Sequence, residues 1–202
     1  WLYYSGKLRK SFVIAGIAIL CVVDMWSVNK RYLHDDQFVP RSAQVDTFKK
    51  TQADEIILQD TDPNYRVLSF SGDAFSENKT SYWHKSVGGY HAAKLRRYQE
   101  MIDRHISPEM QAAYRAIATA GGEMDSVDAS KFRVNMLNTK YFILPAGQGQ
   151  TVPIENPYAY GNAWFVNNVE YVDNANQEID ALNTILPIET AVVDARFKDI
   201  LK

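Results

Sequence analysis

Residues 12–23 read FVIAGIAILCVV, a run of twelve residues without a charge. A membrane-spanning helix needs about 20 mostly apolar residues, so the run alone is short for a span. Apolar and interfacial side chains on both flanks lengthen it: Leu8, Met25, Trp26 and Val28. A signal peptide is disfavoured, because Asp24-Met25-Trp26 stands where a small-residue cleavage site would follow. The pattern predicts one long N-terminal helix and favours a transmembrane span over a buried soluble helix.

Basic residues decide the predicted orientation of this helix. Lys7, Arg9 and Lys10 precede the apolar run, which favours a cytoplasmic N-terminal side, although Lys30 and Arg31 beyond the run weaken the bias. We therefore expect residues 1–33 to form the end of a membrane helix with its exit segment. Residues 34–202 then form a domain outside the cytoplasm. The alternative is a soluble cytoplasmic domain with residues 12–23 in its core.

Composition limits the classes of function. The chain has 202 residues and a formal net charge of -2, so it lacks the basic surplus of a dedicated nucleic-acid binder, and we expect no nucleic-acid partner. Its single cysteine, Cys21, excludes an intramolecular disulfide and a cysteine-based zinc site. We expect no metal site and no cofactor in this chain. Because the chain begins with Trp1, we expect it to be part of a longer protein.

Helical and strand patterns alternate through the remainder of the chain. Apolar spacing and capping residues predict helices over 46–58, 91–105, 107–120, 126–137 and 174–184. The predicted N-cap is Asp46 or Thr47 for the first helix and Asp173 or Asn174 for the last. Ser107-Pro108 is predicted to restart the helix at 107, with Ser107 as N-cap, and Gly121-Gly122 to end it. Strands are predicted at 65–70 and 140–144, in a hairpin of 163–166 with 169–172, and at 191–193 before a last short helix. Residues 71–81 and 147–150 are predicted loops. The mixture indicates an α/β or α+β fold, a small mixed sheet flanked by several helices.

The candidate ligand site surrounds Gly88-Gly89. Backbone N–H groups of the glycine pair, and the N-terminus of the helix predicted from His91, would approach an anion there. Aromatic faces suit sugar rings, and arginine suits phosphate. The candidate ligand-binding residues are His84, Lys85, Tyr90, His91, Arg96 and Arg97. The alternative is a structural turn that packs its aromatic rings into the core, with the arginines in solvent.

Three further groups have ordinary structural interpretations that we favour. His34-Asp35-Asp36 resembles metal ligands but fits a solvated linker better. Asp73 and Glu77 form a carboxylate pair in a predicted loop, where such groups are mostly solvated. The aromatic cluster of Tyr158, Tyr160 and Trp164 is a binding lip or, by our preference, the edge of the core.

Four segments together resemble the bacterial YfhO-type membrane protein family. They are VDMWSVNKRYL at 23–33, YWHKSVGGYHAAKLRRY at 82–98, LNTKYFI at 137–143 and GNAWFV at 161–166. The first resembles the exit of a membrane helix, and the others resemble extracytoplasmic segments. The resemblance covers roughly residues 12–194, and the long tyrosine- and glycine-containing motif is its most specific part.

The resemblance implies a polytopic protein similar to GT-C-type membrane glycosyltransferases, which transfer a sugar from a lipid-linked donor. It places the chain in the bacterial cytoplasmic membrane, with residues after about 34 extracytoplasmic. Implied partners are membrane lipid, through the N-terminal helix, and a lipid-linked sugar or cell-envelope glycan. The catalytic carboxylate of such proteins lies in an early loop, so no catalytic residue is assigned here and the chain alone is expected to be inactive. The alternative is a non-catalytic scaffold domain of the cell envelope.

Overall fold

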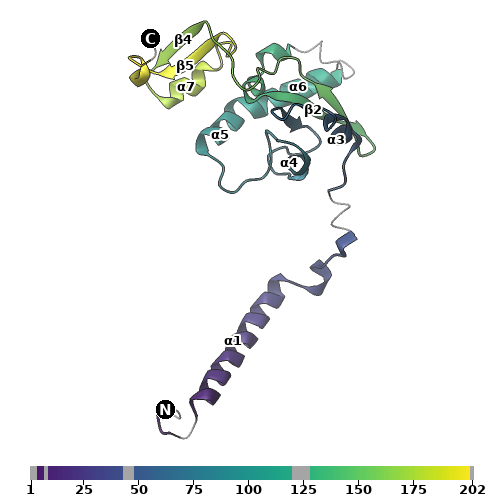
Figure 1. Cartoon of the computed structure of the whole chain (residues 1–202), viewed down its shortest axis with the longest axis vertical. Coiled ribbons are helices and arrows are strands. Elements are labelled where there is room, and N and C mark those ends of the chain that lie inside the picture. The colour runs from purple at the N-terminus through teal and green to yellow at the C-terminus, as the bar shows by residue number, and fades with distance from the viewer. Residues whose placement is uncertain (1–3, 7–8, 43–47, 120–127, 201–202) are drawn as a thin grey trace. The chain divides into compact units, whose positions relative to one another are not determined.

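The computed structural model describes residues 4–6, 9–42, 48–119 and 128–200 (Figure 1). The chain forms two compact units, Trp1–Lys49 and Lys50–Lys202. The fold is mixed α/β, with one long apolar helix in the first unit and two small sheets with helices in the second. The predicted N-caps Asp46 and Thr47 lie outside the described residues.

The first unit is dominated by α1, Lys10–Tyr32, which a 3₁₀ turn, η1 (Asp35–Gln37), follows. None of the 23 residues of α1 is buried, although most carry apolar side chains. The helix is long and apolar enough to cross a membrane. Within its own unit α1 is not buried, whereas the soluble alternative requires residues 12–23 to lie in the core of the domain.

The main sheet of the second unit has the order β1-β2-β3. The strands are β1 (Arg66–Ser69), β2 (Thr139–Gly147) and β3 (Gln150–Glu155). β1 runs parallel to β2, with Leu68 opposite Phe142, and β3 runs antiparallel to β2. The two predicted strands at 65–70 and 140–144 are therefore confirmed, with slightly different ends.

The hairpin of β2 and β3 confirms a connection within the predicted loop at 147–150 and narrows it to residues 148–149. Gly147, Gln148 and Gly149 all have positive φ, which glycine tolerates, and they form the tight connection between the strands. The sequence pattern missed β3 because Pro153 interrupts it, and proline is tolerated there only because β3 is an edge strand. β2 also continues beyond its predicted end at Pro145, because β3 pairs with it as far as Gly147, although β1 pairs with it only as far as Ile143.

One helical run packs against the sheet. It consists of α5 (Arg96–Met101), a π-helical turn η2 (Ile102–Ile106) and α6 (Ser107–Thr119). The buried core between sheet and helices includes Leu68, Phe142, Leu144, Ile102, Ile106 and Ile117. The predicted helix start at His91 is wrong, because residues 91–95 are turn and coil and α5 begins at Arg96. The predicted end at Gly121-Gly122 lies outside the described residues.

The predicted break at Ser107-Pro108 is also wrong, and Pro108 gives a physical reason. A proline inside an α-helix has no backbone N–H to donate to the carbonyl four residues earlier, and its ring clashes with that carbonyl. Here the backbone N–H of Ser107 donates to the carbonyl of Ile102, five residues back, in a widened turn. The helix therefore continues past Pro108 through a π turn and does not restart with Ser107 as N-cap.

Short helical elements complete this part of the unit. α3 (Gln52–Ile57) starts later than the predicted 46–58 helix, because Thr51 forms a capping box with Asp54. α4 (Lys79–Trp83) begins inside the predicted loop at 71–81. Two 3₁₀ turns, η4 (Ala129–Lys131) and η5 (Arg133–Leu137), replace the predicted helix at 126–137, of which residues 126–127 lie outside the described part.

The C-terminal segment is a β-α-β unit. β4 (Asn168–Val172) and β5 (Thr190–Asp194) are parallel, and α7 (Ala175–Ala181) connects them. Of the two predicted N-caps, Asp173 and Asn174, the structure has Asn174. The predicted hairpin is wrong, because the N–H groups of Asn167 and Asn168 donate to the carbonyl of Glu189 and start the parallel pairing. Residues 163–166 are not a strand. η6 (Ala195–Phe197) supplies the predicted last helical turn.

Candidate functional site

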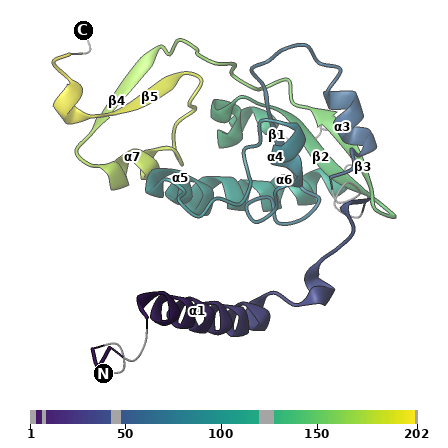
Figure 2. The same ribbon diagram turned by 60° about the horizontal axis from the view of Figure 1, so that its bottom comes forward.

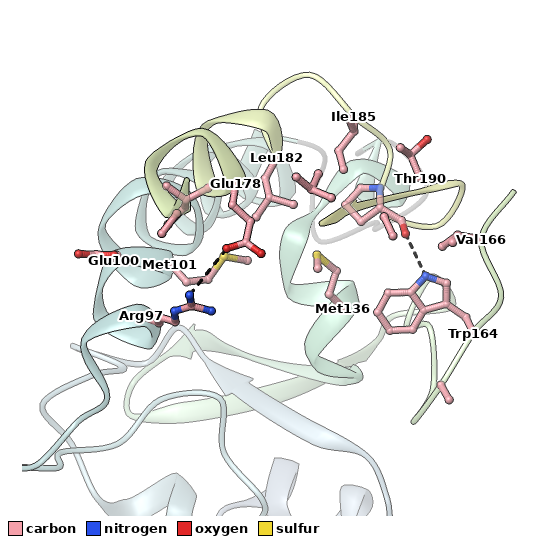
Figure 3. Close-up of a pocket in the computed structure, with 16 residues that line it drawn as sticks. Arg97, Glu100, Met101, Met136, Trp164, Val166, Glu178, Leu182, Ile185 and Thr190 are labelled. Atoms are coloured by element: carbon pink, nitrogen blue, oxygen red, sulfur yellow. Dashed lines mark hydrogen bonds and ion pairs between the residues drawn. The ribbon is translucent and has the colours of Figure 1, made fainter. Parts of the chain in front are cut away.

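A cavity of about 530 Å³ lies where α5 meets the β-α-β unit (Figure 3). Figure 2 shows α7 beside α5 at this end of the unit. We call the cavity the apolar pocket, because most of its lining is hydrocarbon, indole or thioether: Met101, Met136, Trp164, Val166, Ile179 and Leu182. Its volume lies within the range of about 300–1,000 Å³ that is usual for small-molecule sites.

Charged residues stand on one side of the apolar pocket. Arg97 and Glu178 face each other there, with Nη2 of Arg97 3.9 Å from Oε2 of Glu178, and Glu100 lies on the same side (Figure 3). The Arg97 side chain is 74% exposed, so this long ion pair contributes little to stability. Breaking this ion pair therefore costs little free energy, so the guanidinium and the carboxylate can each bind a polar group of a ligand instead.

Trp164 stands on the opposite side of the pocket from this pair (Figure 3). Its indole N–H donates to the carbonyl of Pro187 at 2.9 Å, and its ring meets the edge of Tyr160 with centroids 4.9 Å apart. These contacts fix the half-buried ring in a wall of the pocket. Trp164 thus combines the two alternatives for the aromatic cluster, since it packs at the edge of the core and also lines a cavity.

Polar contacts hold α7 against the helical run. Arg104 forms an ion pair with Asp180 at 2.5 Å, and Nε2 of His105 lies 2.8 Å from the carbonyl of Ile179. A carbonyl only accepts, so Nε2 carries the hydrogen. Burial lowers the pKa of His105, which keeps the imidazole neutral. Both residues belong to the π turn, so this turn supplies two of the contacts that close the pocket.

A third contact runs from η5 to the segment after α7. The guanidinium of Arg133 donates from Nε to the carbonyl of Leu182 at 2.9 Å. Its Nη1 lies 3.3 Å from the carboxylate of Glu109 in α6, and its backbone N–H donates to that carboxylate at 2.8 Å. Burial raises the pKa of Glu109 to about 7 despite these partners.

The structure separates the six ligand residues predicted from sequence. His84 is buried, and its Nε2 lies 2.9 Å from Oδ1 of Asp54. The ammonium of Lys85 donates to the carbonyl of Pro63. These two residues therefore make contacts that belong to the packing of the domain.

The other four candidates lie in three different settings. Tyr90 and His91 line a shallow depression with Lys94. Arg96 forms an i,i+4 ion pair with Glu100 at 3.0 Å. Arg97 alone of the six lines the apolar pocket. The remaining pocket residues come from segments distant in sequence, and only Trp164 among them was singled out from the sequence, as part of the aromatic cluster.

The predicted anion contact at Gly88-Gly89 is wrong. The N–H of Gly88 donates to Oγ of Ser86 at 3.0 Å, and the N–H of Gly89 donates to the carbonyl of Ala74 at 2.6 Å. Both donors are therefore occupied, and the helix N-terminus lies further on, at Arg96. A Cβ at Gly88 would lie 2.0 Å from the carbonyl oxygen of Ala74, so close backbone approach explains the glycine.

No family model, curated protein or solved structure matches the chain. Among the described residues, no group of three or more His, Cys, Asp or Glu side chains is arranged to hold a metal ion. The His34-Asp35-Asp36 stretch is exposed, and Asp35 forms an ion pair with Lys30 at 2.9 Å.

Proposed function

We propose that the chain is the extracytoplasmic part of a bacterial membrane protein similar to lipid-linked-sugar glycosyltransferases. In this proposal α1 anchors the unit Lys50–Lys202 in the cytoplasmic membrane, and the apolar pocket takes an amphipathic, sugar-bearing molecule. The observation that carries the proposal is the 23-residue α1, apolar and without a buried residue.

The dimensions of α1 support the anchor. At about 1.5 Å per residue the helix is about 34 Å long, slightly more than the about 30 Å hydrocarbon core of a bilayer. Phe12 and Leu20 expose 66% and 70% of their surface, an arrangement that is costly in water. Trp26 and Tyr32 lie toward one end of α1, where aromatic side chains favour the membrane interface.

The lining of the apolar pocket supports an amphipathic ligand. Trp164 offers an aromatic face to a sugar ring, and Arg97 and Glu178 offer hydrogen bonds to hydroxyl or phosphate groups on the other side. The hydrocarbon between them suits an alkyl or isoprenyl portion. One molecule with a sugar and an apolar chain would satisfy both parts.

Membrane flotation tests the anchor. We expect the full chain to float with liposomes and a chain of residues 50–202 to stay in the soluble fraction. The variant Leu20→Arg should float less than Leu20→Ala, since a central arginine costs about 2.5–3.5 kcal/mol on insertion scales. Equal flotation of the full and shortened chains would contradict the anchor.

The single cysteine also allows a test of orientation. With Cys21 changed to Ser, cysteines introduced at Ser5 and at Ser42 report the two ends of α1. In intact cells we expect a membrane-impermeant maleimide to label Ser42→Cys and to label Ser5→Cys only after lysis. The reverse pattern would place the domain in the cytoplasm.

Binding of hexyl β-glucoside to the Lys50–Lys202 unit tests the pocket. We expect saturable shifts of the Trp164 indole N–H signal, with methyl glucoside and hexanol at least tenfold weaker than the joined molecule. Val192→Phe, which narrows the pocket, should weaken binding at least tenfold, and Val169→Phe on the exposed β4 should not. Equal binding of hexanol and hexyl glucoside would remove the sugar from the proposal.

A scaffold role is the second candidate. Phe165, beside the pocket residue Trp164, is fully exposed at 102%, and Tyr90 and Leu95 are 71% and 77% exposed. Exposed aromatic and aliphatic side chains are common anchors of protein interfaces. A pull-down from cell-envelope extract with Phe165→Ser as control tests this role, which predicts a partner that the variant loses.

A further inference from the structure

A second cavity of about 250 Å³, lined mostly by residues with polar side chains, lies where β1 ends, and we call it the β1 pocket. Ser69 is the last residue of β1, and Ser71 and Gly72 follow it in the wall of the pocket. The other walls come from the start of α3, the start of α4 and β3. The carboxyl end of a strand in a parallel pair is where open α/β sheets commonly bind ligands.

Two residues that line the β1 pocket each carry a buried oxygen without a partner among the described residues. Thr151 is 8% exposed, and its hydroxyl has no hydrogen-bond partner among the residues that the structure describes. Oε1 of Glu77 is likewise buried and unpaired within the described part of the chain, while Oε2 accepts from the N–H groups of Lys79 and Thr80 at 2.6 and 3.1 Å. Buried polar groups rarely remain unpaired, because each costs about 1–3 kcal/mol.

A rigid carboxylate stands in the same wall. Oδ2 of Asp54 accepts from the N–H and the hydroxyl of Thr51 at 2.7 and 2.8 Å, and His84 contacts Oδ1 at 2.9 Å. Burial raises the pKa of Asp54, but the hydrogen bonds from His84 and Thr51 outweigh it and hold the pKa below its usual value. Asp54 is therefore a fixed anion, and His84 is a positioning residue behind it.

These groups select a class of ligand. A carboxylate oxygen can only accept a hydrogen bond, so Oε1 of Glu77 requires a donor. The carboxylates of Asp54 and Glu77 outnumber the single ammonium of Lys79 in the lining, which disfavours phosphate and other anions. The volume is below the range of about 300–1,000 Å³ of typical drug-sized sites, so the occupant is small.

We infer that the β1 pocket binds one small, uncharged polyhydroxylated molecule, of the size of a single sugar residue or a smaller polyol. Its hydroxyl groups donate to Oε1 of Glu77 and pair with the hydroxyl of Thr151. The site shares no residue with the apolar pocket, and its evidence does not depend on α1. The inference therefore stands or fails separately from the proposed function.

Methyl-threonine NMR of the full chain tests the inference. The chain is placed in phosphatidylcholine nanodiscs, because maltoside or glucoside detergents would themselves present sugar hydroxyls. Methyl β-glucoside, myo-inositol and glycerol are titrated separately, and glucose 1-phosphate serves as the charged probe. We expect at least one neutral probe to shift the methyl signals of Thr151, Thr51 and Thr80 saturably in the millimolar range. Thr184, outside the pocket, should not shift.

Two variants assign the contacts. Thr151→Val keeps the shape and removes the unpaired hydroxyl, so we expect about tenfold weaker binding of the neutral probe, read from Thr51 and Thr80, with an unchanged or raised Tm. Glu77→Gln retains an oxygen for the N–H groups of α4 and should improve the relative affinity of glucose 1-phosphate severalfold. Thr184→Val is the matched control and should change neither affinity.

Three results would overturn the inference. The first is that none of the neutral probes shifts the Thr151 methyl signal at a concentration about 100-fold above a millimolar dissociation constant. The second is that glucose 1-phosphate binds the unmodified chain more tightly than the neutral probes. The third is that Thr151→Val folds and binds as well as the unmodified chain. Because the first two need no variant, misfolding of a variant leaves the inference testable.

Discussion

Glu109 is a carboxyl group inside the domain, so its titration should affect stability. Its side chain is 16% exposed, and its partner is Arg133, with Nη1 at 3.3 Å and the backbone N–H at 2.8 Å. Burial raises the pKa of Glu109 from 4.5 to about 7, because removal of the carboxylate from water costs more than Arg133 returns. The folded state therefore binds this proton more tightly than the unfolded chain does.

The sign and size of the effect follow from proton linkage. A raised pKa in the folded state gives stability that is fully present below pH 4.5 and is lost as the pH rises through about 7. The difference between 4.5 and about 7, at about 1.4 kcal/mol for each pH unit, corresponds to about 3 kcal/mol. Glu109→Gln has nearly the same volume, keeps an oxygen for the N–H of Arg133, and removes the titration.

Urea unfolding of the full chain in nanodiscs from pH 4.5 to 8.5 measures the effect. We expect the free energy of unfolding of the unmodified chain, minus that of Glu109→Gln, to fall by about 3 kcal/mol over this interval. Subtraction removes groups common to both proteins, including His105. Glu100→Gln removes an exposed carboxylate from the same helical run and should change stability by less than about 1 kcal/mol. If the difference in the free energy of unfolding between the two proteins is constant or rises with pH, the reasoning is refuted. The ion pair with Arg133 would then stabilise the Glu109 carboxylate by at least as much as burial destabilises it.

Three other changes probe the packing of the same unit. Gly88→Ala places a Cβ 2.0 Å from a backbone carbonyl oxygen and should lower the free energy of unfolding by about 1–3 kcal/mol, whereas Gly72→Ala, with no atom within 4 Å, should not. Asn156→Ala should cost about 1–3 kcal/mol in urea unfolding, because it leaves the buried side-chain oxygen of Asn135 without its 2.8 Å donor. Hydrogen bonds from a lysine and a tyrosine lower the pKa of Asp60 to about 2, so its stabilising contribution is lost as the pH falls from 3.8 through 2. Acid unfolding followed by circular dichroism should show that loss in the unmodified chain and not in Asp60→Asn.

Local patterns predicted most elements whose residues interact with near neighbours. The apolar run at 12–23 predicted α1, and Asn174 predicted the start of α7, because capping and apolar periodicity act within a few residues. The strands at 65–70 and 140–144 were found from β-branched and aromatic residues between turn signals. What these strands pair with was not predicted.

Pairing over long distances explains the errors. Asn167-Asn168 has the composition of a hairpin turn, yet β4 pairs with β5 across an intervening helix, which no local signal indicates. Gly88-Gly89 has the composition of an anion-binding loop, yet its N–H groups bond to Ser86 and Ala74. In both cases a carbonyl of another segment, that of Glu189 or of Ala74, accepts from an N–H group whose partner the sequence did not indicate.

The candidate sites were less predictable than the fold. Both pockets collect side chains from several segments, so their composition depends on tertiary packing and not on any motif. His84 and Arg97 were chosen from one short stretch, and the structure places the first behind Asp54 and the second in the apolar pocket. Thr151, which carries the inference about the β1 pocket, lies on the strand that the sequence pattern missed.

The π turn connects one proline to the wall of the apolar pocket. Pro108 cannot donate to the carbonyl of Arg104 and would clash with it in a regular α-helix, and the turn before Pro108 widens to i−5 bonding. A widened turn holds one more residue than an α turn, which changes the direction in which its side chains project. Arg104 and His105 lie in that turn and contact Asp180 and the carbonyl of Ile179. The residue that predicted a break in the helix therefore explains the π turn, and the π turn carries two of the contacts that hold α7 beside the cavity.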